Sequence, residues 1–397
     1  MSAENKRILI IVENLPVPLD RRVWQEACAL RNMGHSVTVI CPQMRGFVEP
    51  EETLEGIKIY RHPISGEASG ILGFFMEYTS ALWGESMCAL KAWRKGGFDV
   101  IHLCNPPDIL FLIAFPYKLF AGVKVLYDVH DIWPEMFEAK FSKKNPIYWA
   151  VRFAERCTLA LADVVIATNQ TVLNTVVQRG NKKQKDVFVV RTSPNAIDLA
   201  AQIVPERKNG RRYLVGYIGV MGDADGVDYL LNAIAHIVHQ LKRSDIQFDL
   251  MGSGPEWEKL NEMRKSLRIE DYVTMEGRVS DQYLCETLQT MDMGVGCDPI
   301  NSYNDHCTMN KTLEYMAFGK PQVLFGINEG KISAGDAAVY VDENCPIQLG
   351  DAIVNLLDNL ESCRRLGEIG RERIKGDLSW SRSVDQLKLA YQRALND

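Results

Sequence analysis

The sequence predicts an α/β protein built from two doubly wound parallel-sheet domains. Its 397 residues exceed what one hydrophobic core comfortably serves, so two domains of ~150–200 residues are expected. A hydrophobic fraction of 46% and a charged fraction of 24% are ordinary for a globular protein. Short apolar runs alternate with helical stretches from end to end, which is typical of parallel strands covered by helices on both faces.

The first half of the chain is predicted to hold seven strands. Several of these runs are apolar almost throughout, as strands buried on both faces are. Apolar residues at helical spacing from Val23 to Leu30 predict the first helix, and Gly34 ends it. The strands are expected at residues 7–13, 36–41, 57–61, 99–104, 123–128, 163–168 and 186–191.

A linker is predicted at residues 194–211, because this stretch has two prolines, mixed charge and no sustained hydrophobic period. We therefore expect an N-terminal domain of residues 1–195, a C-terminal domain of residues 196–378 and a last helix at 379–397. The two sheets would face a central cleft, because such folds bind ligands at the carboxyl ends of their strands. The second domain's strands are expected at 213–219, 246–251, 272–276, 293–297, 322–326 and 338–341.

Composition excludes several classes of protein. With 45 basic and 51 acidic residues, the net charge of −6 argues against a partner as acidic as nucleic acid. The 10 cysteines contain no CxxC pair, so neither a zinc site nor a disulfide framework is indicated, and reduced thiols in a cytoplasmic protein fit best. The apolar run at residues 8–12 is too short for a signal peptide, and the run at 109–117 is too short to span a bilayer.

The most informative segment runs from Asp305 to Pro321. Lys311 and Glu314 are three positions apart, so they would share one face of a helix whose expected N-cap is Thr308. A helix N-terminus with a nearby lysine suits a diphosphate, and a carboxylate one turn deeper suits ribose hydroxyls. A solvated Lys–Glu pair is the alternative that the spacing leaves open.

Five segments together resemble one enzyme family. They are YDVHDIWPE at 127–135, GYIGVMGDADGVDYLL at 216–231, LMGSGPEWEKL at 250–260, EGRV at 276–279 and NKTLEYMAFGKP at 310–321. In this order they are similar to the retaining glycosyltransferases of family 4, whose GT-B fold joins two Rossmann-like domains. The resemblance covers nearly the whole chain. It implies transfer of a sugar from a nucleotide donor, with the last helix crossing back onto the N-terminal domain.

The resemblance also implies roles for the matching residues. Glu314 would bind the ribose of the donor, and Lys311 would lie beside its diphosphate. The turn at 219–222 would approach the phosphates, residues 277–278 would border the base, and His130 would lie beside the transferred sugar. The implied donor-binding residues are Gly219, Met221, Gly222, Gly277, Arg278, Met309, Asn310 and Glu314.

One departure from the family concerns the carboxylate that contacts the sugar. Many relatives pair two glutamates eight positions apart, but eight positions before Glu314 stands His306, with Asp305 beside it. We therefore expect Asp305 to take that place, so that the catalytic residues would be His130, Asp305 and Lys311. No strong nucleophile is implied, because the departing diphosphate can take the proton of the acceptor.

A second departure concerns the diphosphate. Relatives commonly carry Arg and Lys in the turn where this sequence has Val220 and Asp225. Arg21 and Arg22 open the first helix and would replace them as phosphate donors. The alternative is that Asp20 caps this helix and both arginines are solvated.

His130 can also be considered without the resemblance. It follows the strand at 123–128, at the end where α/β sheets place functional loops. A histidine there could bond a sugar hydroxyl or assist proton movement, and a purely structural histidine is the alternative. Asp128 is an additional, less favoured candidate.

Two segments raise the question of membrane contact. Residues 71–94 form a long, sparsely charged helix candidate, and residues 140–156 mix basic with aromatic side chains, which suits an anionic membrane surface. The alternatives are a buried helix and a solvated basic loop.

Taken together, these observations and the resemblance predict a metal-independent enzyme without a cofactor. It would be cytoplasmic or peripheral at the inner face of the cell membrane. Its donor would be a nucleotide-sugar, with UDP or GDP as the favoured carrier, and its acceptor a glycan or a polyprenyl-diphosphate-linked sugar in surface-polysaccharide assembly. A nucleotide-sugar 2-epimerase of the same fold and a non-catalytic partner subunit are the alternatives.

Overall fold

The computed structural model describes residues 5–64, 70–141, 146–194 and 207–396. Its contacts divide the chain into two compact units. The N-terminal unit comprises Met1–Thr192 with Ser381–Asp397, and the C-terminal unit comprises Ser193–Trp380. Sequence analysis placed the boundaries after residues 195 and 378, within three residues of these positions. Most of the expected linker, residues 195–206, lies outside the described residues.

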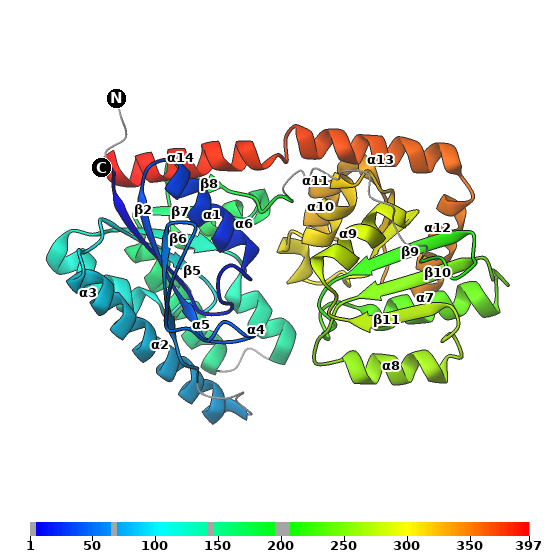
Figure 1. Ribbon diagram of the computed structural model, residues 1–397, viewed down its shortest axis with the longest axis horizontal. Helices are drawn as coiled ribbons and strands as arrows, with labels where there is room; N and C mark the ends of the chain where they lie inside the picture. The colour runs from blue at the N-terminus through cyan, green and yellow to red at the C-terminus, as the bar shows by residue number, and fades with distance from the viewer. Residues whose placement is uncertain (1–4, 65–69, 142–145, 195–206, 397) are drawn as a thin grey trace. The chain divides into compact units, whose positions relative to one another are not determined.

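The N-terminal unit is built on an eight-stranded sheet in the order β3-β4-β2-β1-β5-β6-β7-β8. Figure 1 labels β2 and β5 to β8 of this sheet. All pairs are parallel except β3 with β4. The sequence missed β3 because its four residues, EETL, lack a buried apolar position and form an exposed edge. The strands are β1 (Arg7–Val12), β2 (Ser36–Pro42), β3 (Glu51–Leu54), β4 (Ile57–His62), β5 (Val100–Cys104), β6 (Lys124–Val129), β7 (Val164–Ala167) and β8 (Val187–Val189).

The last helix of the chain, α14 (Trp380–Asn396), completes this unit. Tyr391 is fully buried, and its hydroxyl lies 2.9 Å from Nδ1 of His102 on β5. Arg393 Nε donates to Asp186 at 2.8 Å. The other helices of the unit are α1 (Arg21–Asn32), α2 (Gly70–Arg94), α3 (Phe111–Ala121), α4 (Trp133–Phe141), α5 (Pro146–Leu161), α6 (Gln170–Gly180) and the 3-10 turn η1 (Gln184–Asp186).

The C-terminal unit is built on a six-stranded parallel sheet in the order β11-β10-β9-β12-β13-β14. The chain runs outward from β9 to β11 and then returns to β12 on the other side of β9, so the strand order reverses between β9 and β12. Open α/β sheets bind ligands at such a switch point. The strands are β9 (Tyr213–Ile218), β10 (Ile246–Met251), β11 (Val273–Gly277), β12 (Met293–Gly296), β13 (Gln322–Phe325) and β14 (Ala338–Val341).

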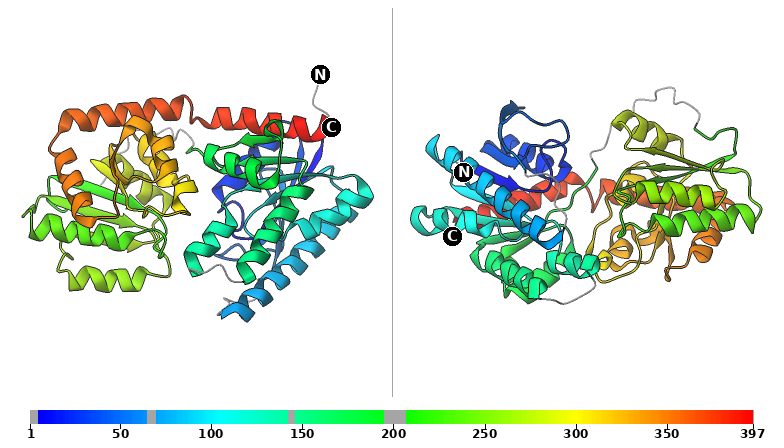
Figure 2. Two further views of the ribbon diagram at one scale, coloured as in Figure 1. Left: turned by 180° about the vertical axis from the view of Figure 1, so that it is seen from behind. Right: turned by 90° about the horizontal axis from the view of Figure 1, so that it is seen from below.

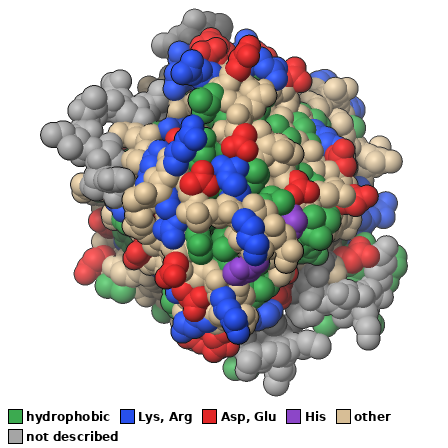
Figure 3. Space-filling model, turned by 90° about the vertical axis from the view of Figure 1, so that its right-hand side faces the viewer, with side chains coloured by type: hydrophobic (Ala, Val, Ile, Leu, Met, Phe, Trp, Pro, Cys, Tyr) green, Lys and Arg blue, Asp and Glu red, His purple; other side chains and the backbone are tan. Residues whose placement is uncertain are grey.

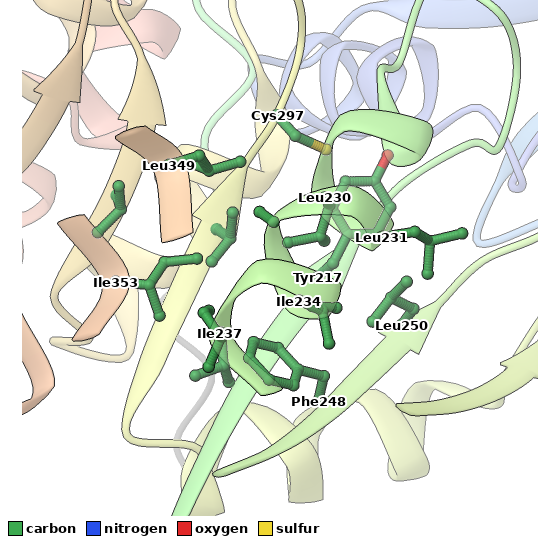
Figure 4. Close-up of a cluster of buried hydrophobic side chains, with 14 of the residues drawn as sticks. Tyr217, Leu230, Leu231, Ile234, Ile237, Phe248, Leu250, Cys297, Leu349 and Ile353 are labelled. Carbon is green, nitrogen blue, oxygen red and sulfur yellow. The ribbon is translucent and has the colours of Figure 1, made fainter. Parts of the chain in front are cut away.

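Helices cover both faces of this sheet (Figure 2). On one face, Leu230 and Ile234 of α7 and Leu349 of α12 belong to one buried cluster with Phe248 of β10 (Figure 4). On the other face, Tyr315 of α10 packs with buried residues of β9 and α9. The helices are α7 (Val227–His239), α8 (Trp257–Ser266), α9 (Asp281–Thr290), α10 (Asn310–Ala317), α11 (Asn328–Ala334), α12 (Pro346–Leu357), α13 (Leu360–Lys375) and the 3-10 turns η2 (Asn304–His306) and η3 (Gly335–Ala337).

The surface carries charges of both signs. Basic and acidic side chains are interspersed with apolar ones over the face that Figure 3 shows. All 10 cysteines are free thiols. Among the described residues, no helix combines the length and the hydropathy that a membrane span requires.

Candidate functional site

The switch point of the C-terminal unit brings the turn after β9 together with the start of α10. A Cβ atom added to Gly219 would lie 2.7 Å from the hydroxyl of Tyr217 and 3.4 Å from Cε of Lys311. Gly219 therefore leaves space for the hydroxyl of Tyr217 and lies within van der Waals reach of the lysine side chain. Gly219, a predicted donor-binding residue, and Lys311, a predicted catalytic residue, are far apart in sequence but are neighbours in the structure.

Lys311 is buried beside an acidic partner that the sequence analysis missed. Its Nζ donates to Oδ1 of Asp298 at 2.7 Å and lies 4.8 Å from the ring centroid of Tyr217. Burial alone would lower the pKa of Lys311, but the charge and the hydrogen bond of Asp298, together with the charges of Cys297 and Asp225, outweigh it and the pKa is raised. Lys311 is therefore a fixed cation. Asp298 comes directly after the apolar run at 293–297, and that position at the end of a strand is the signal that could have identified it.

A second carboxylate lies within the turn after β9. Oδ2 of Asp225 accepts a hydrogen bond from the backbone N–H of Gly222 at 3.1 Å. Burial raises the pKa of Asp225, the charge of Lys311 opposes this and Asp298 adds to it. The turn that the resemblance assigns to phosphate thus holds an acidic side chain of the protein itself.

Helix α10 begins one residue later than the sequence predicted. Its N-cap is Met309 rather than Thr308, and the side chain of Met309 makes no capping bond because a thioether is a poor acceptor. Asn310 is the first helical residue and is exposed. Glu314 is half-buried one turn after Lys311, so both side chains lie near the helix start as expected.

Asp305 lies on η2 and contacts a different element. Its Oδ1 accepts a hydrogen bond from the backbone N–H of Asn328 at 2.9 Å, at the first residue of α11. One carboxylate oxygen therefore has a structural partner. The expected contact of Asp305 with the sugar stays a prediction.

Met221 does not fit the role that the resemblance assigned to it. Its side chain is fully buried in the core, its N–H donates to the carbonyl of Ser253 at 3.2 Å, and its carbonyl accepts from the N–H of Glu256 at 3.0 Å. Because no part of Met221 is exposed, the prediction that it contacts the donor is wrong. Gly277, with φ +72°, and the exposed Arg278 stay predictions for the base.

His130 belongs to the N-terminal unit, where it follows β6. Its Nε2 lies 2.6 Å from Oδ2 of Asp128, and its side chain is 15% exposed. Its backbone N–H donates to Oδ1 of Asn105 at 2.7 Å. Asn105 comes directly after β5 and was not recognised from the sequence.

The start of α1 corrects the prediction for Arg22. Asp20 caps the helix by accepting from the N–H of Val23 at 3.0 Å, as the alternative proposed. Arg22, however, is 7% exposed and neither solvated nor available to phosphate. Its Nη2 and Nε donate to the two oxygens of Asp128 at 2.6 and 2.9 Å, because a buried guanidinium needs a paired carboxylate. Arg21 is exposed, and its contact with phosphate stays a prediction.

The same region contains a group that could be taken for a metal site. Ligand atoms of His102, Cys104 and Asp128 lie within 4.8 Å of one another. The residues do not fit a metal, since the guanidinium of Arg22 already holds both oxygens of Asp128. Burial also raises the pKa of Cys104 well above its usual value, so this residue is a neutral thiol rather than a thiolate ligand.

Comparison with protein families assigns both units. Residues 19–191 match the model of the glycosyl transferase 4-like domain, and residues 212–359 match that of glycosyl transferases group 1. The chain belongs to the GT-B glycosyltransferases. This glycosyltransferase is 20% identical to an uncharacterized glycosyltransferase of Methanocaldococcus jannaschii over 91% of each chain. It is 23% identical to the D-inositol 3-phosphate glycosyltransferase of Corynebacterium efficiens, over 89% of this chain and 84% of that protein.

Solved structures share the fold of this glycosyltransferase. Sucrose-phosphate synthase of Thermosynechococcus elongatus superposes with a TM-score of 0.79 at 16% identity, covering 98% of this chain and 99% of that one. Anabaena HepE, solved with UDP and glucose, has a TM-score of 0.69 at 15% identity and 99% coverage of both chains. The predicted GT-B fold and transferase class are confirmed, and neither the epimerase nor the non-catalytic alternative is favoured.

Proposed function

We propose that this glycosyltransferase takes a nucleoside-diphosphate sugar as its donor, with the diphosphate beside Lys311 and the ribose at Glu314. The observation that carries the proposal is the buried ammonium of Lys311 at the switch point between β9 and β12. The N-terminus of α10 adds backbone N–H groups to the same place. Structures of the same fold that hold UDP or ADP are consistent with this donor class.

The proposed reaction retains the configuration at the sugar and belongs to surface-polysaccharide assembly, as the family 4 resemblance implies. The bond from the sugar to the diphosphate breaks, and a bond to an acceptor hydroxyl forms on the same face. The proton of that hydroxyl passes to the departing diphosphate. The protein's part is to orient both substrates and to stabilise the negative charge on the departing diphosphate. Lys311 supplies this stabilisation without a metal ion. The proposed acceptor is a glycan or a polyprenyl-diphosphate-linked sugar.

The donor site is tested by thermal unfolding with UDP, GDP, CDP, ADP and TDP, alone and as sugar conjugates. A nucleotide at about 100 times its Kd should stabilise the protein by about 2.7 kcal/mol. Glu314→Ala should abolish the shift, because it removes the carboxylate that binds the ribose. Glu372→Ala is the matched control, since Glu372 and Lys375 repeat the spacing of the Lys311–Glu314 pair and their side chains are exposed on α13. A shift that survives Glu314→Ala, or no shift with any nucleotide, would contradict the proposal.

We further propose that the N-terminal unit contacts an anionic membrane surface. The supporting observation is that large apolar side chains are exposed on three helices, of which α3 packs against both α2 and α5. Arg94 at the end of α2 and Arg156 on α5 are exposed cations on the same helices. The side chains of Lys140, Lys143 and Lys144 lie outside the described residues. The exposed apolar residues are Met76, Trp83, Met87, Leu112, Phe115, Leu119, Phe120, Trp149 and Phe153.

Sedimentation with anionic vesicles at low salt tests this contact. The wild type should pellet with vesicles, and the combined substitution Phe120→Ser, Trp149→Ser and Phe153→Ser should reduce the bound fraction severalfold. Ile347→Ser with Leu360→Ser is the control, because these residues are 55% and 54% exposed in the C-terminal unit. Equal binding by all three proteins, or none by the wild type, would exclude this surface.

A further inference from the structure

His130 is held by two neighbouring strands at once. Asp128 on β6 lies 2.6 Å from Nε2 of the ring, while Asn105 after β5 accepts from the backbone N–H at 2.7 Å. The amide nitrogen of Asn105 also donates to the carbonyl of Asp131 at 2.8 Å. The side chain of Asn105 therefore fixes the backbone of residues 130–131, and the ring is fixed separately by Asp128.

Asp128 is itself fixed by a third element. Arg22 on α1 binds both carboxylate oxygens of Asp128 with its planar fork, at 2.6 and 2.9 Å. The remaining arm of the guanidinium, Nη1, donates to the carbonyl of Val190 at 2.6 Å. Both side chains are buried, with exposed fractions of 7% and 0%. The carboxylate that meets His130 thus has a single defined orientation.

Further titratable groups surround this cluster. From β5, Nε2 of His102 lies 3.7 Å from both Asp128 Oδ2 and Glu26 Oε2. From α1, Oε1 of Glu26 lies 3.1 Å from Nη2 of Arg22, and Asp20 adds a further acidic charge. From α14, the hydroxyl of Tyr391 lies beside His102, and Cys104 on β5 is a neutral thiol.

We propose that Asp128, oriented by Arg22, is a positioning residue for His130 that binds the Nε2–H proton and leaves Nδ1 as the ring nitrogen presented to the substrate. In the neutral ring this makes Nδ1 an acceptor for a hydroxyl, and in the protonated ring a donor. Only the identity of the ligand that Nδ1 contacts, the donor sugar, rests on the proposed function. The geometry of the pair stands independently of it.

The charge of Asp128 also affects the proton affinity of the ring. Burial alone would lower the pKa of His130, but Asp128 outweighs this and Asp20 adds to it, so the pKa is raised despite the opposing charge of Arg22. Replacing the carboxylate with an amide removes the largest stabilising charge. The pKa of His130 should then fall.

The decisive measurement is histidine NMR on the full-length protein labelled with 15N, with His130→Gln identifying the His130 signals. The wild type should show the Nε2–H tautomer and a pKa above 6.5, and Asp128→Asn should lower that pKa. Asp163→Asn is the matched control, because Asp163 also forms an ion pair and contacts the other end of β6 through the N–H of Val125. An Nδ1–H tautomer, or the same titration in wild type and Asp128→Asn, would overturn the proposal.

Arg22→Lys keeps the positive charge but removes the guanidinium that donates to both oxygens of Asp128. It therefore tests the positioning of His130 even if Asp128→Asn does not fold. We expect a mixture of tautomers in this variant, and an unchanged tautomer would overturn the role given to Arg22. Turnover against pH separates this proposal from the proposed function. If Asp128→Asn moves the titration while His130→Gln retains wild-type turnover, positioning is supported and the sugar contact of His130 is what fails.

Discussion

At the scale of single residues, the proposed donor site carries more negative charge than the segment 305–321 alone indicates. The sequence predicted that Lys311 faces a diphosphate, but Asp298 already lies 2.7 Å from its Nζ. Asp225 is a second carboxylate in this region, and it accepts a hydrogen bond from the N–H of Gly222. A diphosphate beside Lys311 would therefore compete with Asp298 for the ammonium and would lie near another negative charge.

This charge balance gives a prediction for Asp225→Asn. Removing one negative charge should strengthen the binding of nucleoside diphosphates by about 1 kcal/mol, or about fivefold in Kd, because the repulsion is lost while an acceptor for the N–H of Gly222 remains. Titration calorimetry with the nucleotide identified by thermal unfolding measures the effect. Asp228→Asn, an exposed aspartate in the first turn of α7, is the control, and weaker binding by Asp225→Asn would contradict the prediction.

At the scale of elements, α14 shows how an apolar stripe gains a specific partner. The spacing of Trp380, Leu387 and Tyr391 predicts a helix with one buried face. The structure adds a polar contact to that face, because the hydroxyl of Tyr391 meets His102 in the core of the N-terminal unit. A buried histidine nitrogen without this partner would lose a hydrogen bond that water cannot replace.

Tyr391→Phe should therefore lower the free energy of unfolding of the N-terminal unit by about 1–2 kcal/mol. The ring still fills its space, so the loss reports the hydrogen bond rather than a cavity. Urea unfolding followed by tryptophan fluorescence is the measurement. Leu389→Ala on the same helix, where Leu389 is 46% exposed, should change the midpoint much less, and equal effects of the two variants would exclude this explanation.

At the scale of the whole molecule, buried carboxyl groups make stability depend on pH. Burial raises the pKa of Asp108 to about 7, although Tyr127 and Asn105 bond to its carboxylate and oppose the shift. Burial likewise raises the pKa of Glu26 to about 8 in spite of Arg22. Such a group keeps its proton in the folded state at a pH where the unfolded chain has lost it, so it favours folding at low pH and the benefit is lost as the pH rises.

We therefore expect the free energy of unfolding to fall between pH ~4 and pH ~7, with Asp108 contributing up to ~1.4 kcal/mol per pH unit. Asp108→Asn should reduce this slope, measured from urea unfolding at several pH values. Asp99→Asn is the contrast. The side chain of Arg7 lowers the pKa of Asp99, so its contribution is lost only as the pH falls below about 4. An unchanged slope in Asp108→Asn would show that Asp108 is not the group responsible.

Much of the fold followed from local patterns. Strands such as β1 and β7 are apolar along nearly their whole length, so their position could be predicted without their neighbours. The placement of Lys311 and Glu314 near the start of one helix followed from their spacing in the same way. Edge strand β3 was missed because it buries no apolar residue, and Met221 was assigned to the ligand although it belongs to the core.

The sequence by itself determined the α/β class, the two units, nearly all strands and the transferase resemblance, because each depends on periodicity or on residues close together in the chain. Only the tertiary structure decided which charged groups pair. Arg22 and Asp128 are 106 residues apart, and His102 and Tyr391 are 289 apart. Such partners meet only when strand order and helix packing place them side by side, and burial without water then makes the pairing obligatory.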